Sequence, residues 1–275
     1  MIKKTFLGVS ILCLLVFSFG VQKAVANANN NDTGICVTTP KPGLYVFKLD
    51  TVKLKGRIRP YFATGLETNK EVFEKTKAKL VVNAGFFDPK NQQTISYVTY
   101  NSETVLDPTK NTNLMNNPIL KPYMNKILNR SEFRIMSCGG DMKYDIAPHN
   151  APVPTACYIK HAIQAGPSLL PEPKLEQEFF VVKKDGKIVS QSASVLHPYA
   201  RTAIGIKDNN VYIIIATTKA PMTLEAMSEF LNTLELEKAM AFDGGGSTSI
   251  DYADIHIVSD KDQTARKLKS FLVVE

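Results

Sequence analysis

The chain has 275 residues, of which 44% are apolar and 21% are charged, with 15 glycines and 15 prolines. These proportions exclude a collagen-like repeat, a coiled coil and a wholly disordered chain, and the length suits one large domain or two small ones. The formal net charge is +7, but the sequence has no tryptophan and no Lys/Arg cluster interleaved with aromatic residues. We therefore do not expect it to bind nucleic acid.

The N-terminal residues 1–28 have the outline of a signal peptide. Lys3 and Lys4 precede an apolar run over residues 5–20, and small residues follow over 24–28. The apolar run is about 16 residues long, against the roughly 20 that span a bilayer, which favours a cleaved signal over a membrane anchor. We expect a secreted or periplasmic protein with no stable membrane insertion after cleavage.

The polar residues 29–35 are predicted to form a flexible leader, followed by one folded domain over residues 36–275. Short runs rich in β-branched or aromatic residues predict strands at 44–47, 80–82, 95–100, 202–206, 211–216, 240–242 and 271–274. Apolar residues at helical spacing predict helices at 67–79, 117–128 and 223–234, the last capped by Thr223. Many strands and few helices, without regular alternation, predict an α+β domain built on a mixed sheet. Residues 107–157 are interpreted as an insertion or cap over that sheet, within which 107–130 is the covering segment.

The cysteines favour one disulfide. Cys138 and Cys157 bracket a proline-rich stretch with little core of its own, and a disulfide is stable in an oxidising compartment. The alternative is a zinc site formed by these two cysteines with His149 and His161. It is disfavoured because the spacing from Cys138 to His149 is too long for a knuckle and because oxidation competes with thiolate ligation. Cys36 is left over.

The densest chemical signal is the sequence A-F-D-G-G-G-S-T at residues 241–248. A buried strand ends there in Asp243 and three glycines, and consecutive glycines allow backbone amides to point into a site as an anion nest. Ser247 and Thr248 add hydroxyl donors. The alternative is a simple tight turn after a strand. The spacing and the absence of a following lysine exclude a nucleotide-binding P-loop.

Two more motifs also place polar side chains at the end of a predicted strand, where they could bind a ligand. In the stretch N-A-G-F-F-D, Asn83 and Asp88 are candidates to bind sugar hydroxyls, with Phe86 or Phe87 as a flat face for a sugar ring; the alternative is an Asx-turn with both aromatics in the core. In R-T-A-I-G-I, Arg201 stands at the mouth of an apolar strand, where it either binds an anionic substrate or forms an internal ion pair with an acid such as Asp243.

Taken in chain order, N-A-G-F-F-D, Q-A-G-P-S-L-L, R-T-A-I-G-I and A-F-D-G-G-G-S-T-S resemble the phosphodiester glycosidase family over residues 80–275. The resemblance implies an α+β catalytic domain that hydrolyses a sugar-1-phosphodiester, with a phosphate-bearing sugar or glycan as its partner. By motif position it implies that Asn83, Gly85, Asp88, Gly166, Arg201, Thr202, Asp243, Gly245, Gly246 and Ser247 lie in or around the site. With the local chemistry added, we predict Asp243 and Arg201 as catalytic and the other eight, together with Gly244 and Thr248, as substrate-binding.

A single prominent carboxylate suits that chemistry, because a phosphate monoester leaves as a stable anion and needs little protonation. Asp243 is predicted to act as a nucleophile or a base, while Arg201 and the amides of Gly244 to Gly246 hold the phosphate. No cofactor is predicted. A Ca²⁺ or Mg²⁺ ion beside Asp243 and Asp88 stays open as an alternative, although there is no dedicated ligand loop. Two other functions also stay open: a non-catalytic envelope module that binds phosphate-bearing glycans, and a structural factor whose segment 107–157 docks a partner.

Overall fold

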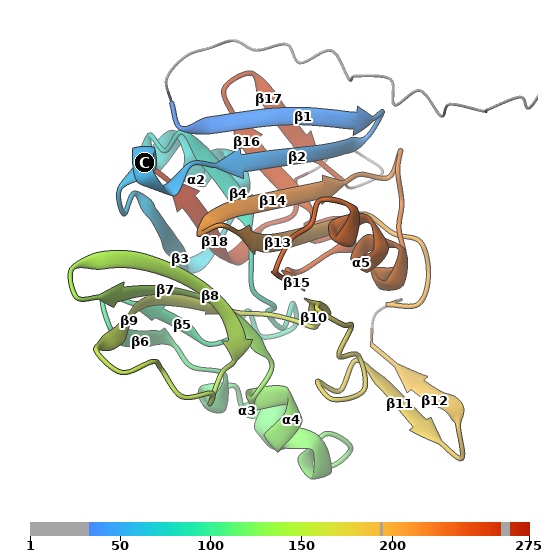
Figure 1. Ribbon diagram of the computed structural model, residues 1–275. Helices are drawn as coiled ribbons and strands as arrows, with labels where there is room; N and C mark the ends of the chain where they lie inside the picture. Colours follow the sequence, from blue (N-terminus) through green and yellow to red (C-terminus); the bar gives the residue numbers. More distant parts are fainter. Residues whose placement is uncertain (1–32, 193–194, 260–264) are drawn as a thin grey trace, which may run out of the picture.

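A computed structural model of the chain describes residues 33–192, 195–259 and 265–275. The predicted signal peptide and residues 29–32 of the predicted leader lie outside them. The described part is an α+β domain of antiparallel sheets with a few short helices, as expected (Figure 1). Instead of one mixed sheet, three large sheets and a small hairpin are present, and every strand pairing within the described residues is antiparallel.

The first sheet has six strands in the order β1-β2-β14-β13-β15-β10. Its strands are β1 (Ile35–Lys41), β2 (Leu44–Leu49), β14 (Asn210–Ala216), β13 (Arg201–Lys207), β15 (Lys238–Ala241) and β10 (Ser168–Leu170). Both faces are buried, because Ile213 and Ile215 of β14 enter one apolar cluster while Ile214 between them enters another. Helix α5 (Leu224–Thr233) packs in the second cluster, beside this sheet (Figure 1).

The second sheet has five strands in the order β17-β16-β4-β18-β3. They are β17 (Ile255–Val258), β16 (Ser249–Tyr252), β4 (Leu80–Asn83), β18 (Leu268–Val274) and β3 (Ile58–Glu67). Helix α2 (Asn69–Thr76) covers one face through Val72. Thr68 caps its N-terminus: the Thr68 hydroxyl accepts from the Glu71 amide, and the Glu71 carboxylate accepts from the Thr68 amide.

The third sheet has the order β6-β5-β9-β7-β8. Its strands are β6 (Glu103–Leu106), β5 (Val98–Tyr100), β9 (Cys157–Gln164), β7 (Ser131–Cys138) and β8 (Asp141–Pro148). All three sheets contribute to one apolar cluster, which includes Phe47 of the first, Leu272 of the second and Phe133 of the third. One shared core supports the prediction of a single domain.

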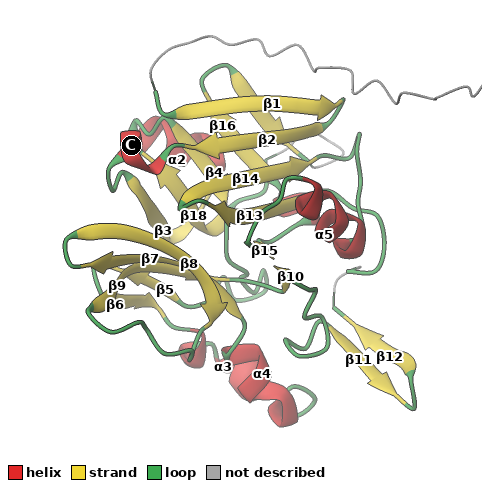
Figure 2. Cartoon of the chain, in the orientation of Figure 1, coloured by secondary structure: helices red, strands yellow, loops and turns green. Residues whose placement is uncertain are grey.

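Residues 107–157 therefore have two structural roles. Residues 108–128 form short turns and the helices α3 (Thr112–Met115) and α4 (Met124–Leu128), which lie at one end of the third sheet (Figure 2). The rest supplies β7 and β8. Of the helix expected over 117–128, only the end is α-helical, because Pro118 and Pro122 interrupt it. The helices expected at 67–79 and 223–234 are confirmed, including the Thr223 cap.

Two smaller features complete the fold. The hairpin β11 (Val181–Lys184) and β12 (Lys187–Gln191) projects away from the three sheets (Figure 1). The remaining short helix, α1 (Thr51–Leu54), follows β2. None of the helices in the described ranges is long and apolar enough to cross a bilayer.

The predicted disulfide between Cys138 and Cys157 is present, and it joins the ends of the paired strands β7 and β9. The alternative zinc site is thus wrong for these cysteines, and the described residues hold no cluster of three metal-binding side chains. Cys36 is a free, exposed thiol.

Candidate active site

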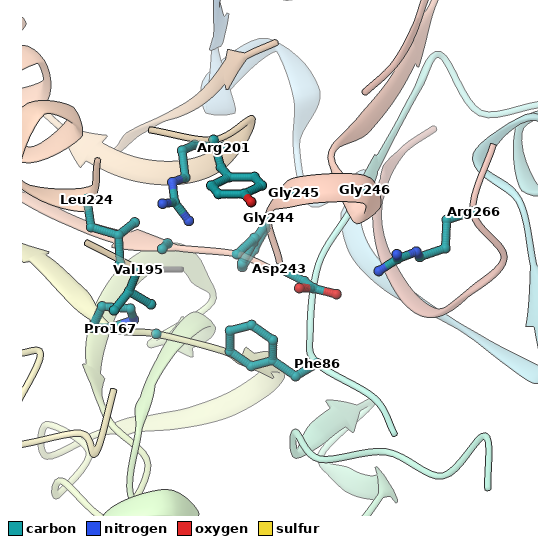
Figure 3. A pocket seen from close by; sticks show the side chains of 14 residues that line it. Phe86, Pro167, Val195, Arg201, Leu224, Asp243, Gly244, Gly245, Gly246 and Arg266 are labelled. Carbon is teal, nitrogen blue, oxygen red and sulfur yellow. The ribbon is translucent and has the colours of Figure 1, made fainter. Parts of the chain in front are cut away.

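A cavity of about 270 Å³ opens where strands of the first two sheets end. Its lining comprises Phe86, Gly166, Pro167, Val195, Tyr199, Arg201, Leu224, Ala241, Phe242, Asp243, Gly244, Gly245, Gly246 and Arg266 (Figure 3). Among these residues, Asp243 is the one acid and the two arginines are the only cations. The ionised cavity lining therefore carries one net positive charge, which suits an anionic ligand.

The antiparallel register of β13 and β15 brings Arg201 and Asp243 to the same end of the sheet. Ala203 pairs with Ala241, and the pairing continues one step further because the Phe242 amide donates to the Thr202 carbonyl at 2.9 Å. Continuing that register sets Arg201 opposite Asp243. The two residues expected to meet from distant parts of the sequence therefore line one cavity.

The Asp243 carboxylate lies among protein atoms at the cavity wall. Desolvation by burial raises its pKa to about 6, and this effect exceeds the lowering by the Ser247 hydroxyl, the Arg266 charge and the Gly244 amide, in that order. At neutral pH the group is still mostly ionised. A carboxylate with a pKa close to the working pH is suited to act as a base or nucleophile.

The Asp243 backbone is held from β4. The Asn83 side-chain amide donates to the Asp243 carbonyl at 2.5 Å, and the Asp243 amide donates to the Ala84 carbonyl at 2.8 Å. The Asn83 side-chain oxygen accepts from the Thr202 hydroxyl at 2.7 Å and from the Ser249 amide at 3.1 Å. Asn83 and Thr202 are both buried, so these predicted substrate-binding residues lie beneath the cavity and position its wall.

Arg201 is buried, and its guanidinium is oriented by backbone carbonyls. Its Nε donates to the Met222 carbonyl at 2.9 Å and its Nη2 to the His197 carbonyl at 2.7 Å. Burial lowers its pKa to about 10, so it stays protonated at neutral pH. Within the described residues no salt bridge joins Arg201 to Asp243.

The three glycines do not form the free row of amides that the sequence suggested. The Gly244 amide lowers the pKa of the Asp243 carboxylate, and the Gly245 amide donates to the Ala200 carbonyl at 2.8 Å. Glycine is instead required at position 244 because neighbouring atoms lie close to its backbone. A Cβ on Gly244 would lie 3.2 Å from the Ala200 carbonyl oxygen and 3.7 Å from Nη1 of Arg201. Gly245 also has a φ of +62°.

Of the other predicted site residues, some line the cavity and some are packed outside it. Gly166 lines the cavity with a φ of +90°, and a Cβ there would lie 2.2 Å from Oε2 of the buried Glu178. Gly85 is packed away from the cavity, where a Cβ would meet Ser96 at 2.9 Å. Ser247 is buried and its hydroxyl lowers the pKa of the Asp243 carboxylate, whereas the buried Thr248 hydroxyl has no hydrogen-bond partner in the described structure.

Asp88 does not line the Asp243 cavity. Its Oδ1 accepts from the Lys90 amide at 2.8 Å, which is the Asx-turn considered as the alternative for this motif. Its Oδ2 accepts from the Asn113 side chain at 3.0 Å, and the residue lines a second cavity. Asp243 and Asp88 therefore line different cavities. This separation argues against the alternative in which one divalent cation is held between them.

Sequence reasoning missed Arg266 and Tyr199. The Arg266 side chain is exposed and extends toward the Asp243 carboxylate (Figure 3), and its Nη1 donates to the Ser247 hydroxyl at 3.4 Å. Nothing in the local sequence separates it from the neighbouring Lys267. Tyr199, which is 48% exposed, stands two positions before Arg201 and provides an aromatic wall.

His197 and His256 do not line the cavity. His197 is exposed and contributes only its carbonyl to Arg201. His256 binds Asp251 at 2.6 Å on β17, away from the cavity lining.

Comparisons with known proteins agree with this architecture. A solved catalytic domain of zebrafish N-acetylglucosamine-1-phosphodiester alpha-N-acetylglucosaminidase, described as auto-inhibited by its pro-peptide, is 15% identical with a TM-score of 0.58. The match covers 88% of this chain and 81% of that one. A hypothetical protein from Synechocystis is 14% identical with a TM-score of 0.52, over 88% of this chain and 61% of that one.

A putative exported protein from Burkholderia pseudomallei K96243 is 12% identical with a TM-score of 0.51, over 84% of this chain and 73% of that one. At these identities the likenesses show a shared fold. No curated protein matches the sequence. The family described as phosphodiester glycosidase matches residues 76–275, which is more than two thirds of the chain. The protein therefore belongs to the phosphodiester glycosidase family.

Proposed function

We propose that the protein hydrolyses the bond between the anomeric carbon of a sugar and a phosphate oxygen in a sugar-1-phosphodiester. The observation that carries this proposal is the charge pattern of the cavity, in which one carboxylate with a pKa of about 6 lies between two arginines. An ordinary glycosidase has two carboxyl groups, one of which protonates a poor leaving group. A departing phosphate monoester is already a stable anion, so one carboxylate suffices.

In the proposed reaction, the ionised Asp243 attacks the anomeric carbon or removes a proton from an attacking water. The electron pair of the broken carbon–oxygen bond stays on the phosphate oxygen. After water has added, the products are the free sugar and a phosphate monoester. Both routes need the ionised form of Asp243, so the proposal links the rate to a group that titrates near pH 6.

Arg201 and Arg266 would hold the phosphate from two sides. Arg201 is rigid because two backbone carbonyls fix its guanidinium, whereas Arg266 is an exposed residue two positions before β18. Charge-assisted hydrogen bonds to phosphate are about twice as strong as neutral ones. The Gly246 amide, which makes no hydrogen bond within the described residues, is a further donor at the same wall.

Phe86 and Tyr199 provide two aromatic faces of the cavity. An aromatic ring packs against the C–H face of a sugar ring, while its edges leave the hydroxyls free to bind water or protein. This arrangement supports a sugar as the part of the substrate that sits beside Asp243. The disulfide supports an extracellular or periplasmic setting, and we propose an envelope or extracellular glycan as the natural substrate.

The test uses purified protein and a panel of sugar-1-phosphate methyl diesters with gluco, galacto, manno and N-acetylglucosamine rings, together with UDP-N-acetylglucosamine. Mass spectrometry follows the free sugar. Wild-type protein should release sugar from at least one substrate, and Asp243→Asn should lower that rate about 1,000-fold or more. Asp254→Asn, which changes an exposed aspartate outside the cavity, should leave the rate unchanged.

Binding of the panel without release of sugar would contradict the proposal and favour a non-catalytic glycan-binding module. Equal turnover by wild-type protein and Asp243→Asn would contradict the role given to Asp243.

A further inference from the structure

The second cavity, of about 690 Å³, lies between the loop after β4 and the segment around α3. We name it the asparagine groove, because four of its lining residues are Asn111, Asn113, Asn116 and Asn117. Its volume falls within the range of about 300–1,000 Å³ that small-molecule sites occupy. None of its lining residues contributes to the Asp243 cavity.

We propose that the asparagine groove binds uncharged saccharide units, and that it holds a part of the glycan beyond the bond that is cleaved. This inference rests on the proposed function only in taking a glycan as the ligand. The free polar groups of the groove, its charge and its shape support the binding of a neutral saccharide.

Some polar groups of the groove form hydrogen bonds within the protein, and others remain available to a ligand. Asn111 is buried and fully used: its Oδ1 accepts from the Leu114 amide at 3.2 Å and from Asn91, and its Nδ2 donates to the Thr94 carbonyl at 3.1 Å. Asn113 donates to Asp88 and keeps its Oδ1 available. These contacts fix the frame of the groove.

Three further groups face the groove without a protein partner. Asn116 is exposed, and within the described residues its side chain makes no hydrogen bond at either end. The same holds for the Thr112 hydroxyl, while Asn117 uses its Oδ1 on the Ile119 amide at 3.0 Å and keeps its Nδ2 available. Each amide offers both donors and acceptors, which matches a sugar hydroxyl that also donates and accepts.

Charge and apolar contacts favour a neutral saccharide over an anion. Asp88 and Lys90 are the two ionisable residues of the groove, and their charges cancel. Ile95, Pro118 and Leu120 supply apolar surface between the amides, suited to the C–H faces of sugar rings. No strand lines the groove, so it offers no edge on which an extended peptide would add as a strand.

The loop after β4 connects this groove with the Asp243 cavity. Phe86 lines the cavity and Asp88 lines the groove, two residues apart. The loop is internally paired, since the Ile95 amide donates to the Phe86 carbonyl at 2.9 Å and the Asp88 amide donates to the Gln93 carbonyl at 2.8 Å. One short, hydrogen-bonded loop therefore separates the two sites, so a single glycan chain is a suitable ligand for both.

The test measures binding of an array of neutral oligosaccharides with glucose, galactose, mannose and N-acetylglucosamine units, followed by titration calorimetry of the best binder. Asp243→Asn should bind as wild-type protein does. The double variant Thr112→Val/Asn116→Ala should bind about tenfold more weakly or worse, because it removes unpaired groups that no fold contact uses. Asn232→Ala, which changes an exposed asparagine on α5, is the matched control and should bind normally.

Turnover of the small methyl diesters by the double variant should stay at the wild-type level, since these probes do not reach the groove. As a check that needs no variant, the side-chain amide NMR signals of Asn113 and Asn117 should shift during titration of wild-type protein. If no neutral oligosaccharide binds, or if binding is the same in the double variant and these signals stay still, the groove proposal is overturned. Absence of sugar release from every methyl diester by wild-type protein would instead overturn the proposed function.

Discussion

The side-chain amide of Asn83 donates a hydrogen bond of 2.5 Å to the carbonyl of Asp243, although the two residues are 160 positions apart in the sequence. The same side chain accepts from Thr202 and from Ser249. One buried amide thus joins the ends of β4 and β13 to the start of β16 and sets where the Asp243 carboxylate emerges. Asn83 therefore acts as a positioning residue for Asp243.

Replacing Asn83 with alanine is expected to lower both stability and turnover. The change leaves three groups without their partner, at a cost of about 1–3 kcal/mol for each unsatisfied buried group, so we expect a loss of about 3 kcal/mol or more in the free energy of unfolding. Urea denaturation measures this loss. Because the Asp243 backbone is released, kcat should also fall by more than tenfold in conditions where the variant is folded, with KM little changed. A normal kcat in folded Asn83→Ala would show that Asn83 serves the fold alone.

The raised pKa of Asp243 predicts a specific dependence of stability on pH. Its pKa is about 6 in the folded protein against a reference value of 3.8, so the folded state binds the proton more tightly. The stabilisation from that proton is fully present below about pH 4 and is lost as the pH rises through 6. Asp243→Asn should therefore be more stable than wild-type protein at pH 7, by about 1–3 kcal/mol, and should lose this advantage toward pH 4.

The difference in free energy of unfolding between the two proteins, measured from pH 4 to pH 7, isolates this group from the other carboxylates. A difference that stays constant over the range would contradict the raised pKa. In the same account, kcat/KM of wild-type protein should rise with pH through about 6 and then level off, because the reaction uses the ionised carboxylate.

Removal of Arg266 should affect substrate binding and the pH profile together. Its positive charge lowers the pKa of Asp243, so in Arg266→Ala the rising limb of the kcat/KM profile should move to higher pH. The loss of a charge-assisted contact to phosphate should raise KM by about 10- to 100-fold. Stability should change little because the side chain is exposed.

Lys267→Ala is the matched control, since Lys267 is an exposed neighbour that lies outside the cavity and pairs with Glu71 at 3.7 Å. It should leave both KM and the pH profile unchanged. If Arg266→Ala behaves like this control, Arg266 has no part in the site.

The disulfide between Cys138 and Cys157 should stabilise the domain measurably. It closes a loop with a sequence separation of 19, for which loop-closure entropy predicts about 3 kcal/mol. Cys138→Ser/Cys157→Ser should lose about this amount in denaturant unfolding, whereas Cys36→Ser should not, because that thiol is free. Equal stability of the double variant and wild-type protein would show that strand pairing alone holds β7 to β9.

Much of the fold could be predicted from local sequence, but strands that carry charge were missed. The apolar runs at 80–82, 202–206 and 211–216 are strands, and Thr223 begins α5. The strand β7 was not predicted because Glu132 and Arg134 interrupt its apolar pattern. In the structure these two side chains form a buried pair at 2.8 Å, a contact that exists only once the sheet has formed.

The candidate site, too, could be predicted from the sequence only in part. The strand ends that carry Asn83, Arg201 and Asp243 could be recognised as chemical signals, but their meeting depends on sheet register that no local pattern encodes. Asp88 follows the same kind of local motif and lies in the other cavity, because the loop turns at Lys90. Arg266 comes from a polar stretch with several similar cations, so only the structure distinguishes it.

The bond that Asp243 helps to break can be identified by running the reaction in ¹⁸O-labelled water and analysing the released phosphate monoester by mass spectrometry. Attack at the anomeric carbon breaks the sugar carbon–oxygen bond, so the phosphate product should contain no ¹⁸O, and its formation should require Asp243. Incorporation of ¹⁸O into the phosphate product would show attack at phosphorus and would contradict the proposed attack at the anomeric carbon.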